Sequence, residues 1–489
     1  MADPMAKPRD ERERPTNEPA TAAKPPGAAA PKEIGWLPDC VYTGEKFETG
    51  MAFFADGTGR IVRFSREPAD LAAAKRLPGQ AALPGLVNTH AESWQRVLRG
   101  RFETRLRTDR DTVGNWREAH ERALGALGAE DIYDAAKMAF IEMLIAGITC
   151  VGECHFLHRQ ADGTPWPEPL AAAKAILRAA HDTGIRIALL NGAWGRADFR
   201  QPAGSGPARS MIASAEAFVR ETEALRDYIE KNHPGDEAWI GVAARSLGAV
   251  PLEYLKAVAT YVRAKRLRLH LRLGETATER EACVAEYGRT PAVLLAEHGL
   301  LDKRFTAVHG GCLGEEDIRA LGAAHAVVCA CPASEWAQMA GGVPAGKLLA
   351  AGATLALGTG DAQQINLLED ARLVDANLRA SRERAALDGD AATALFHLAT
   401  VAGARSLGAP GGALEVGRPA DFFTVNVYDP SIAGAAPETL LSAVTLAVSP
   451  RAIREVWVGA RARVAQWRHP AQSGATTRFT EMQKRIWGG

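Results

Sequence analysis

The chain has 489 residues, of which 47% are hydrophobic and 24% charged, an ordinary composition for a globular protein. Its 58 basic and 58 acidic residues cancel, so the net charge gives no reason to expect nucleic acid or an anionic membrane surface as a partner. The sequence also lacks an apolar run of about 18 residues, as a membrane span needs. We therefore expect a cytoplasmic protein with a small-molecule substrate, and leave its oligomeric state open.

The two ends of the chain differ from its middle in composition and in the pattern of apolar segments. Residues 1–32 are rich in Pro, Ala and charge, without the apolar stretch of a signal peptide, and we expect them to be disordered. Short apolar segments follow, and similar ones return near the C-terminus, as in 420–427 and 453–464. Because neither group is long enough for a convincing sheet alone, we predict one composite β-sandwich from residues 33–82 and 408–470. Residues 471–489 are a separate C-terminal segment.

Between these ends, apolar strand-like runs alternate with amphipathic helical segments. Continuous apolar runs are typical of strands that are buried on both faces. The alternation predicts an α/β fold, a (β/α)₈ TIM-type barrel over residues 83–405. An open doubly wound sheet is the main alternative, and it is disfavoured because no GxGxxG turn follows the first strand. The eight predicted strands cover residues 82–89, 148–154, 186–190, 239–244, 267–273, 305–309, 326–331 and 354–358.

Ionisable side chains lie at or beside most of the predicted strand ends. Chemistry in such barrels sits at the C-terminal ends of the strands. Each of these residues alone is more often a helix cap or a packed polar group, but together they indicate a polar pocket. They are His90, Glu92, Glu153, His155, His158, Arg245, His270, Arg272, Glu275, His309 and Asp361.

Six segments around these positions resemble the amidohydrolase superfamily, and within it the formimidoylglutamate deiminases of the cytosine/guanine deaminase branch. The resemblance implies a hydrolase acting on a non-peptide C–N bond, such as an amidine, of a small polar substrate. It also implies one divalent metal, usually zinc, which lowers the pKa of a bound water. The segments are LPGLVNTHAESWQR (83–96), ECHFLHRQADGTPW (153–166), GVAARSLGAV (241–250), LHLRLGETATEREAC (269–283), AVHGGC (307–312) and ALGTGDAQQIN (356–366).

Only some of the family's metal-ligand residues are kept in this sequence. The resemblance implies His90, Glu92 and His309 as metal ligands, with Glu92 in the place of a histidine. A carboxylate can still bind zinc, but Arg272 stands where a further histidine belongs, and a guanidinium has no lone pair to offer. We predict that Arg272 pairs with Glu92 or Glu275 and fills the old metal cavity. Zinc is thus implied by the resemblance, while these changes leave open a chain that holds no metal.

The family's catalytic residues are also only partly kept in this sequence. The resemblance implies Glu275 as the proton shuttle and Asp361 as the strand 8 aspartate, although the ungapped position of that aspartate is Gly360. Because strand side chains alternate between faces, Asp361 is expected to point away from the barrel axis unless a bulge re-aims it.

Three residues are predicted to bind substrate. Gln95 and Arg117 match substrate-holding positions of the family, and Arg245 is placed to grip a carboxylate that the family holds from a nearby position. For Arg117, a salt bridge on a helix surface is an equal alternative.

Three functions remain open on these residues. The first is an active C–N hydrolase with a rearranged metal site. The second is a catalytically inactive relative, a pseudoenzyme that keeps the barrel to bind a ligand or a partner. The third is a metal-free enzyme that uses Glu275 and Arg272 in a new pocket.

Overall fold

The computed structural model describes residues 33–101, 112–205, 207–337, 341–387 and 389–488. The predicted disorder of residues 1–32 lies outside the described residues and stays a prediction. Across the described ranges, no helix is both long and apolar enough to cross a membrane.

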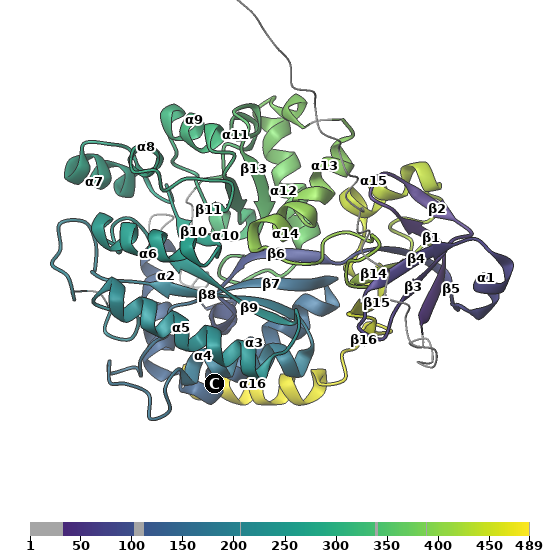
Figure 1. Cartoon of the computed structure of the whole chain (residues 1–489), viewed down its shortest axis with the longest axis horizontal. Helices are drawn as coiled ribbons and strands as arrows, with labels where there is room; N and C mark the ends of the chain where they lie inside the picture. Colours follow the sequence, from purple (N-terminus) through teal and green to yellow (C-terminus); the bar gives the residue numbers. More distant parts are fainter. Residues whose placement is uncertain (1–32, 102–111, 206, 338–340, 388, 489) are drawn as a thin grey trace, which may run out of the picture. The chain divides into compact units, whose positions relative to one another are not determined.

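Eight parallel strands in the described chain form a barrel in sequence order (Figure 1). A bridge between Ala91 and Gly360 joins the last strand to the first, and buried hydrogen bonds between Asn88 and Thr359 support this closure. The predicted (β/α)₈ barrel is confirmed. Its strands are β6 (Leu86–Ala91), β7 (Ile148–His155), β8 (Arg186–Ala193), β9 (Ala238–Ala244), β10 (Leu269–Arg272), β11 (Phe305–Val308), β12 (Val327–Ala330) and β13 (Thr354–Leu357).

Helices cover the outer face of the barrel, so its strands are almost wholly buried, as their apolar sequences predict. Side chains cap several of the helices: Ser214 accepts a hydrogen bond at the start of α5, and Asn366 does so at the start of α12. The elements around the barrel are α2 (Thr112–Ala126), α3 (Ala129–Ile145), α4 (Ala171–Thr183), α5 (Ala215–Asn232), α6 (Leu252–Ala264), α7 (Ala277–Tyr287), α8 (Pro291–Glu297), α9 (Glu315–Ala323), α10 (Pro332–Ala337), α11 (Ala345–Ala350), α12 (Leu367–Ala380), α13 (Ala391–Leu398), α14 (Val401–Leu407) and the 3₁₀ helix η1 (Ser93–Leu98).

Strands from both ends of the described chain meet in a second sheet, purple and yellow in Figure 1. Its order is β16-β15-β14-β5-β1-β3-β4, with β2 paired to β1. The join between the two ends is the antiparallel pair β5–β14. The strands are β1 (Ile34–Tyr42), β2 (Phe47–Thr49), β3 (Ala52–Ala55), β4 (Ile61–Ser65), β5 (Lys75–Pro84), β14 (Phe422–Asn426), β15 (Ile453–Val458) and β16 (Arg461–Ala465), accompanied by the helices α1 (Pro68–Ala73) and α15 (Pro437–Ala447).

This sheet curls around an aromatic core. Phe53 on β3 and Phe422 on β14 are three strand spacings apart, which is roughly 14 Å in a flat sheet. Their ring centroids are nevertheless only 5.1 Å apart, and Trp36 lies 5.2 Å from each. The composite β-sandwich expected from both chain ends is therefore present as one curled sheet.

Two predicted strands prove to be two elements each. The segment 453–464 is the hairpin β15–β16, which turns at Gly459 and Ala460 with φ of 56° and 61°. Positive φ at both central residues is typical of a type I′ turn, and an alanine there gives little sequence signal. The predicted first barrel strand, 82–89, divides at Gly85, where the chain leaves β5 and enters β6.

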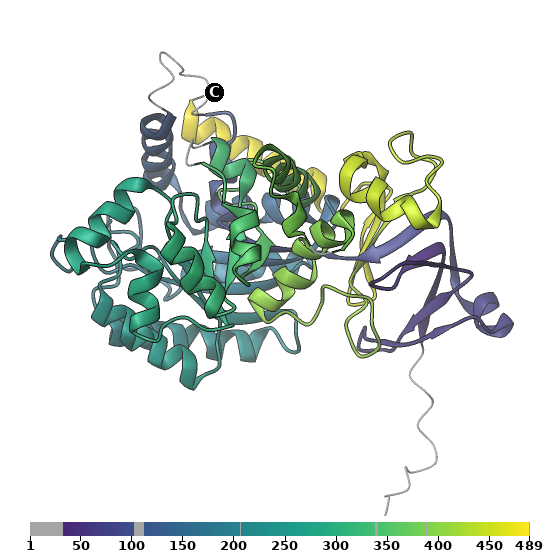
Figure 2. The ribbon, with the colours of Figure 1, turned by 90° about the horizontal axis from the view of Figure 1, so that it is seen from above.

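The C-terminal segment 471–489 contains the helix α16 (Gln472–Trp487), which packs on α3 beside the barrel (Figure 2). Its buried face includes Phe479 and Ile486. Arg478 forms an ion pair of 2.7 Å with Asp134 of α3. This segment therefore belongs to the barrel's helical layer.

A buried ion pair links the curled sheet to the barrel. Arg186, the first residue of β8, donates to both carboxylate oxygens of Asp421 at 2.6 and 3.2 Å. Asp421, just before β14, also accepts the backbone N–H of Gly459 at 2.7 Å. Arg186 and Asp421 are 4% and 2% exposed, so neither charge can be compensated by water.

We expect Asp421→Ala to lower the free energy of unfolding by ~2–4 kcal/mol, because it leaves the buried Arg186 charge with only Asp236, a partly exposed carboxylate 2.5 Å away, as its partner. Urea or thermal unfolding measures the change. The matched control is Glu415→Ala, which removes the exposed 2.6 Å pair with Arg418 and should cost less than ~1 kcal/mol. Equal losses in the two variants would contradict the structural role of Asp421.

Candidate active site

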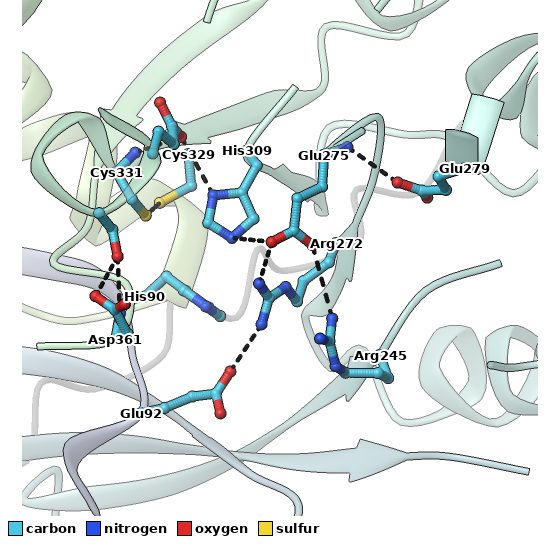
Figure 3. Close-up of polar contacts among 12 residues, drawn as sticks. His90, Glu92, Arg245, Arg272, Glu275, Glu279, His309, Cys329, Cys331 and Asp361 are labelled. Atoms are coloured by element: carbon cyan, nitrogen blue, oxygen red, sulfur yellow. Dashed lines mark hydrogen bonds and ion pairs between the residues drawn. The ribbon is translucent and has the colours of Figure 1, made fainter. Parts of the chain in front are cut away.

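Side chains from three strand ends converge at the C-terminal mouth of the barrel (Figure 3). Glu92 follows β6, Arg272 ends β10 and His309 follows β11. Glu275 lies in the turn before α7, whose N-cap Thr276 accepts the N–H of Glu279. His309 adopts a φ of 69°, which is uncommon outside glycine and often marks functional positions.

Arg272 is the centre of this cluster. Its guanidinium contacts Glu92 at 3.1 Å and Glu275 at 2.5 Å, so the predicted pairing is present with both carboxylates. Arg272 is 7% exposed and Glu92 6%. Burial alone would lower the pKa of Arg272, but the two carboxylates outweigh it and raise that pKa above its ordinary value. A fixed positive charge therefore occupies the middle of the barrel mouth.

A second guanidinium approaches from the solvent side. Arg245 lies 3.8 Å from Glu275, and its guanidinium carbon sits 5.4 Å from the ring centroid of Trp194. Burial pushes the pKa of Glu275 up, but Arg272, His309 and Arg245 together hold it well below its ordinary value. Glu275 is therefore a carboxylate with weak basicity.

The predicted substrate residues are placed differently from one another. Gln95 is buried and donates to Glu92 at 2.6 Å, so it fixes the carboxylate that pairs with Arg272. Arg117 lies on an exposed part of α2. Only Arg245 among the three directly contacts the Arg272–Glu275 pair. Their roles in substrate binding remain predictions.

His309 presents its two ring nitrogens to two different groups. Its Nε2 faces Glu275 at 4.0 Å, whereas its Nδ1 lies 3.2 Å from Glu335. The other predicted metal histidine, His90, lies 3.1 Å from the thiol of Cys154 through Nδ1. Burial, with His309 and Arg272 nearby, lowers the pKa of His90 well below its ordinary value, so His90 is neutral.

Asp361 forms its hydrogen bonds on the far side of His90 from the Arg272 cluster. Its carboxylate accepts hydrogen bonds from Ser334 and, at 2.7 Å, from Gln363. The ungapped position of the family's aspartate, Gly360, has a φ of 56°, and a Cβ there would lie 2.6 Å from the Ser334 hydroxyl. An aspartate at 360 would thus be strained and crowded.

These residues do not fit zinc at the family's position. Arg272 replaces a lone-pair donor by a cation, and it engages both Glu92 and Glu275. Gly360 supplies no side chain, and His90 contacts a thiol. At an effective dielectric near 20, a +1 charge about 4 Å from a +2 ion costs on the order of 8 kcal/mol before relaxation. The arrangement around Arg272 therefore opposes a dication at this point.

Several residues at the site escaped the sequence reasoning. Cys331 directly precedes α10 and Glu335 lies in the first turn of that helix, and nothing in the segment CPASEW alone links them to His309. His120, three residues beyond Arg117, packs on Trp94 with ring centroids 4.9 Å apart. Burial, then Arg245 and Arg272, lowers the pKa of His120 to about 3. The sequence signal for His120 was its position in GNWREAH, the same segment that holds the predicted substrate residue Arg117.

Glu153 of β7 supports the loop that carries Glu92. It accepts hydrogen bonds from the backbone N–H and the hydroxyl of Ser93 at 2.8 and 2.6 Å. Burial raises the pKa of this fully enclosed carboxyl to about 8. The folded protein therefore holds a proton that the unfolded chain releases at lower pH.

We expect Arg272→Met to destabilise the protein by ~3–5 kcal/mol at pH 8, because two buried carboxylates lose their cation. Arg272 lowers the pKa of Glu275, so its contribution is full above the unfolded pKa of Glu275 and is lost only as the pH falls towards the much lower folded pKa. Denaturation at pH 8 and at about pH 3 measures this difference, because most of the contribution is still present at pH 4. Adding Glu92→Gln should recover part of the loss, whereas Arg289→Met, at the exposed pair with Glu297, should cost under ~1 kcal/mol.

A second expectation concerns Glu153. Because its folded pKa is raised, wild-type stability should fall as the pH rises from about 4.5 to about 8. Glu153→Gln should reduce this fall, with a gain of up to ~4 kcal/mol relative to the wild type at pH 8, while the raised pKa values of Glu279 and Asp370 maintain the remainder. Stability measured across this pH range, with exposed Glu45→Gln as control, checks the point. An unchanged pH slope in Glu153→Gln would show that Glu153 ionises normally.

Comparison with known proteins identifies the family to which this barrel is similar. Residues 81–463 match the model of the amidohydrolase family. A formimidoylglutamate deiminase from Pseudomonas aeruginosa is 31% identical over 450 residues, covering 88% of this chain and 97% of the relative. A 5-methylthioadenosine/S-adenosylhomocysteine deaminase from Teredinibacter turnerae is 30% identical over 366 residues, 72% of this chain and 73% of the relative.

Solved structures share the fold. An amidohydrolase from Brucella melitensis superposes with a TM-score of 0.83 at 24% identity, over 93% of this chain and 99% of that one. Atrazine chlorohydrolase from Arthrobacter aurescens TC1, complexed with zinc, gives 0.78 at 22% identity, over 92% and 100%. With the family model matched over most of its length, the chain belongs to the amidohydrolase family.

Proposed function

We propose that this chain is a hydrolase that acts on a non-peptide C–N bond of a small polar substrate bearing a carboxylate, with amidine deimination as the model reaction. The observation that carries the proposal is the position of Glu275, which lies at the barrel mouth between Arg272, Arg245 and His309. Similarity to a formimidoylglutamate deiminase over nearly that protein's whole length supports it.

Arg245 is the residue best suited to the substrate's carboxylate. Its contact with Glu275 is long, at 3.8 Å, and its side chain is 23% exposed, so it can exchange this partner for an incoming anion. A guanidinium binds a carboxylate through two parallel hydrogen bonds. Trp194 beneath the guanidinium restricts its movement. Arg245 would thereby orient the substrate with its reactive end toward Glu275.

Glu275 is the acid/base group in this proposal. Water adds to the carbon of the protonated amidine and gives one proton to the Glu275 carboxylate, which leaves a neutral tetrahedral intermediate. Glu275 returns that proton to the departing nitrogen and the C–N bond breaks. The hydroxyl proton of the intermediate passes to the released ammonia, so the products are an amide and ammonium. The low pKa of Glu275 makes it a weak base, so the substrate must weaken the hold of the guanidiniums for turnover. No metal at the family's position takes part in this scheme.

The Arg272 ion pairs favour a second candidate, a barrel that binds a carboxylate ligand without turnover. Arg272 and Glu275 neutralise each other in a buried contact of 2.5 Å, and this arrangement suits anion binding by Arg245 more directly than water activation. It corresponds to the pseudoenzyme hypothesis. Affinity for ligand without product release would distinguish it from the hydrolase.

The test is ammonia release from N-formimidoyl-L-glutamate by the purified full-length chain, with substrate binding followed by calorimetry. We expect turnover that Glu275→Gln reduces by at least ~100-fold, as loss of an acid/base group does. Arg245→Met should mainly raise KM. Glu281→Gln, an exposed change on α7, should leave the rate unchanged. Binding without ammonia would establish the second candidate, and the absence of both would refute this substrate class.

A further inference from the structure

Beneath the mouth, on the other side of His309 from Arg272, lies a buried acidic and thiol-rich cluster. Glu335 and Asp370 are 3% and 0% exposed, and Cys329 and Cys331 are both fully buried. Among the ion pairs of the described residues, neither Glu335 nor Asp370 meets a lysine or arginine. Buried carboxylates without a cation are costly. Burial, with Glu335 nearby, raises the pKa of Asp370 well above its ordinary value, which reflects that cost.

The donor atoms of this cluster are already close together. One ligand atom each from His309, Cys331 and Glu335 lie within 4.8 Å of one another. His309 Nδ1 and Glu335 Oε1 are 3.2 Å apart, and the sulfurs of Cys329 and Cys331 are 4.0 Å apart. A tetrahedral zinc site separates neighbouring nitrogen and oxygen ligands by roughly 3.4 Å and two sulfurs by roughly 3.8 Å. Small shifts of His309, Cys331 and Glu335 would therefore bring three ligands into such a site, whereas Cys329 must move further to complete it.

Two buried side-chain atoms without a hydrogen bond, one a free ligand atom and the other on a ligand's far side, add an independent indication. Within the described part of the chain, Glu335 Oε2 is buried and has no hydrogen-bond partner. Its other oxygen is occupied, since it accepts the N–H of Cys331 at 2.8 Å. That bond fixes the carboxylate beside the thiol. The Nε2 of His309 also lacks a hydrogen bond and faces Glu275, and a metal-bound histidine typically turns its other N–H toward a carboxylate.

We propose that His309 Nδ1, the Cys331 thiolate and the Glu335 carboxylate bind a zinc-like divalent cation. Cys329, whose sulfur lies 4.0 Å from that of Cys331 but outside this three-residue cluster, moves in as the fourth donor (His309, Cys329 and Cys331 are labelled in Figure 3). The site differs from the family's position because it uses His309 Nδ1, which faces Glu335, and not Nε2, which faces Glu275 and the Arg272 pairs. Binding releases the thiol protons to solvent as the metal–sulfur bonds form. The cation would neutralise the buried Glu335 carboxylate, which has no lysine or arginine partner among the described residues. This inference does not depend on the proposed hydrolase activity.

The test is titration of the chelator-treated, full-length protein with Co²⁺, whose absorption bands report tetrahedral thiolate coordination. We expect one Co²⁺ per chain, a higher Tm with metal, and competition by Zn²⁺. Cys331→Ser and Glu335→Gln should each weaken binding by at least ~10-fold. Cys329→Ser should weaken it and reduce the thiolate-to-metal band. Cys312→Ser, a change at the half-buried thiol, is the matched control and should bind like the wild type.

Circular dichroism of each metal-free variant separates a lost ligand from a lost fold, and the three ligand variants provide alternatives if one does not fold. The proposal is overturned if the wild type takes up no Co²⁺. It is also overturned if Cys331→Ser and Glu335→Gln bind as the wild type does while Glu92→Gln abolishes binding, because the metal would then sit at the family's position. Ammonia release is measured separately, so failure of the hydrolase proposal leaves these outcomes readable.

Discussion

The permanent charge of one buried guanidinium determines how the side chains at the barrel mouth are arranged. Arg272 reaches the centre of the barrel mouth from the end of β10. Its guanidinium forms ion pairs with Glu92, which follows β6, and with Glu275 in the turn before α7. Gln95 holds Glu92 in place, and Glu153 holds the loop that carries both. Charge neutrality in a poorly solvated space thus fixes the position of side chains from three separate segments.

The fold was predictable because its signals are long and repeated. Eight apolar runs alternating with amphipathic helices leave few topologies open, and the pairing of Arg272 with Glu92 followed from two complementary changes of charge. The hairpin at Gly459 and Ala460 was missed because an alanine with positive φ carries no local signal. Glu335 and Cys331 were missed for another reason: their approach to His309 depends on how the chain turns into α10, which spacing along the sequence does not encode.

The chain shows how far a barrel mouth can change while its scaffold stays intact. The overall fold agrees with solved structures at 24% and 22% identity, with TM-scores of 0.83 and 0.78. The fold depends on apolar packing and backbone hydrogen bonds, which do not involve the charged groups at the strand ends. Substitutions at positions 92 and 272 could therefore accumulate together without disturbing the barrel.

The composite sheet has a consequence for synthesis on the ribosome. β5 pairs with β14, residue Pro84 opposite Phe422, so the whole barrel is translated before β5 gains this neighbour. Until then β5 offers an open edge, and Phe53 and Trp36 lack the ring of Phe422 that covers them in the finished protein. The strands β1–β5 therefore remain only partly assembled through most of translation. During that interval chaperone binding would protect the nascent chain from pairing with its neighbours on the same polysome.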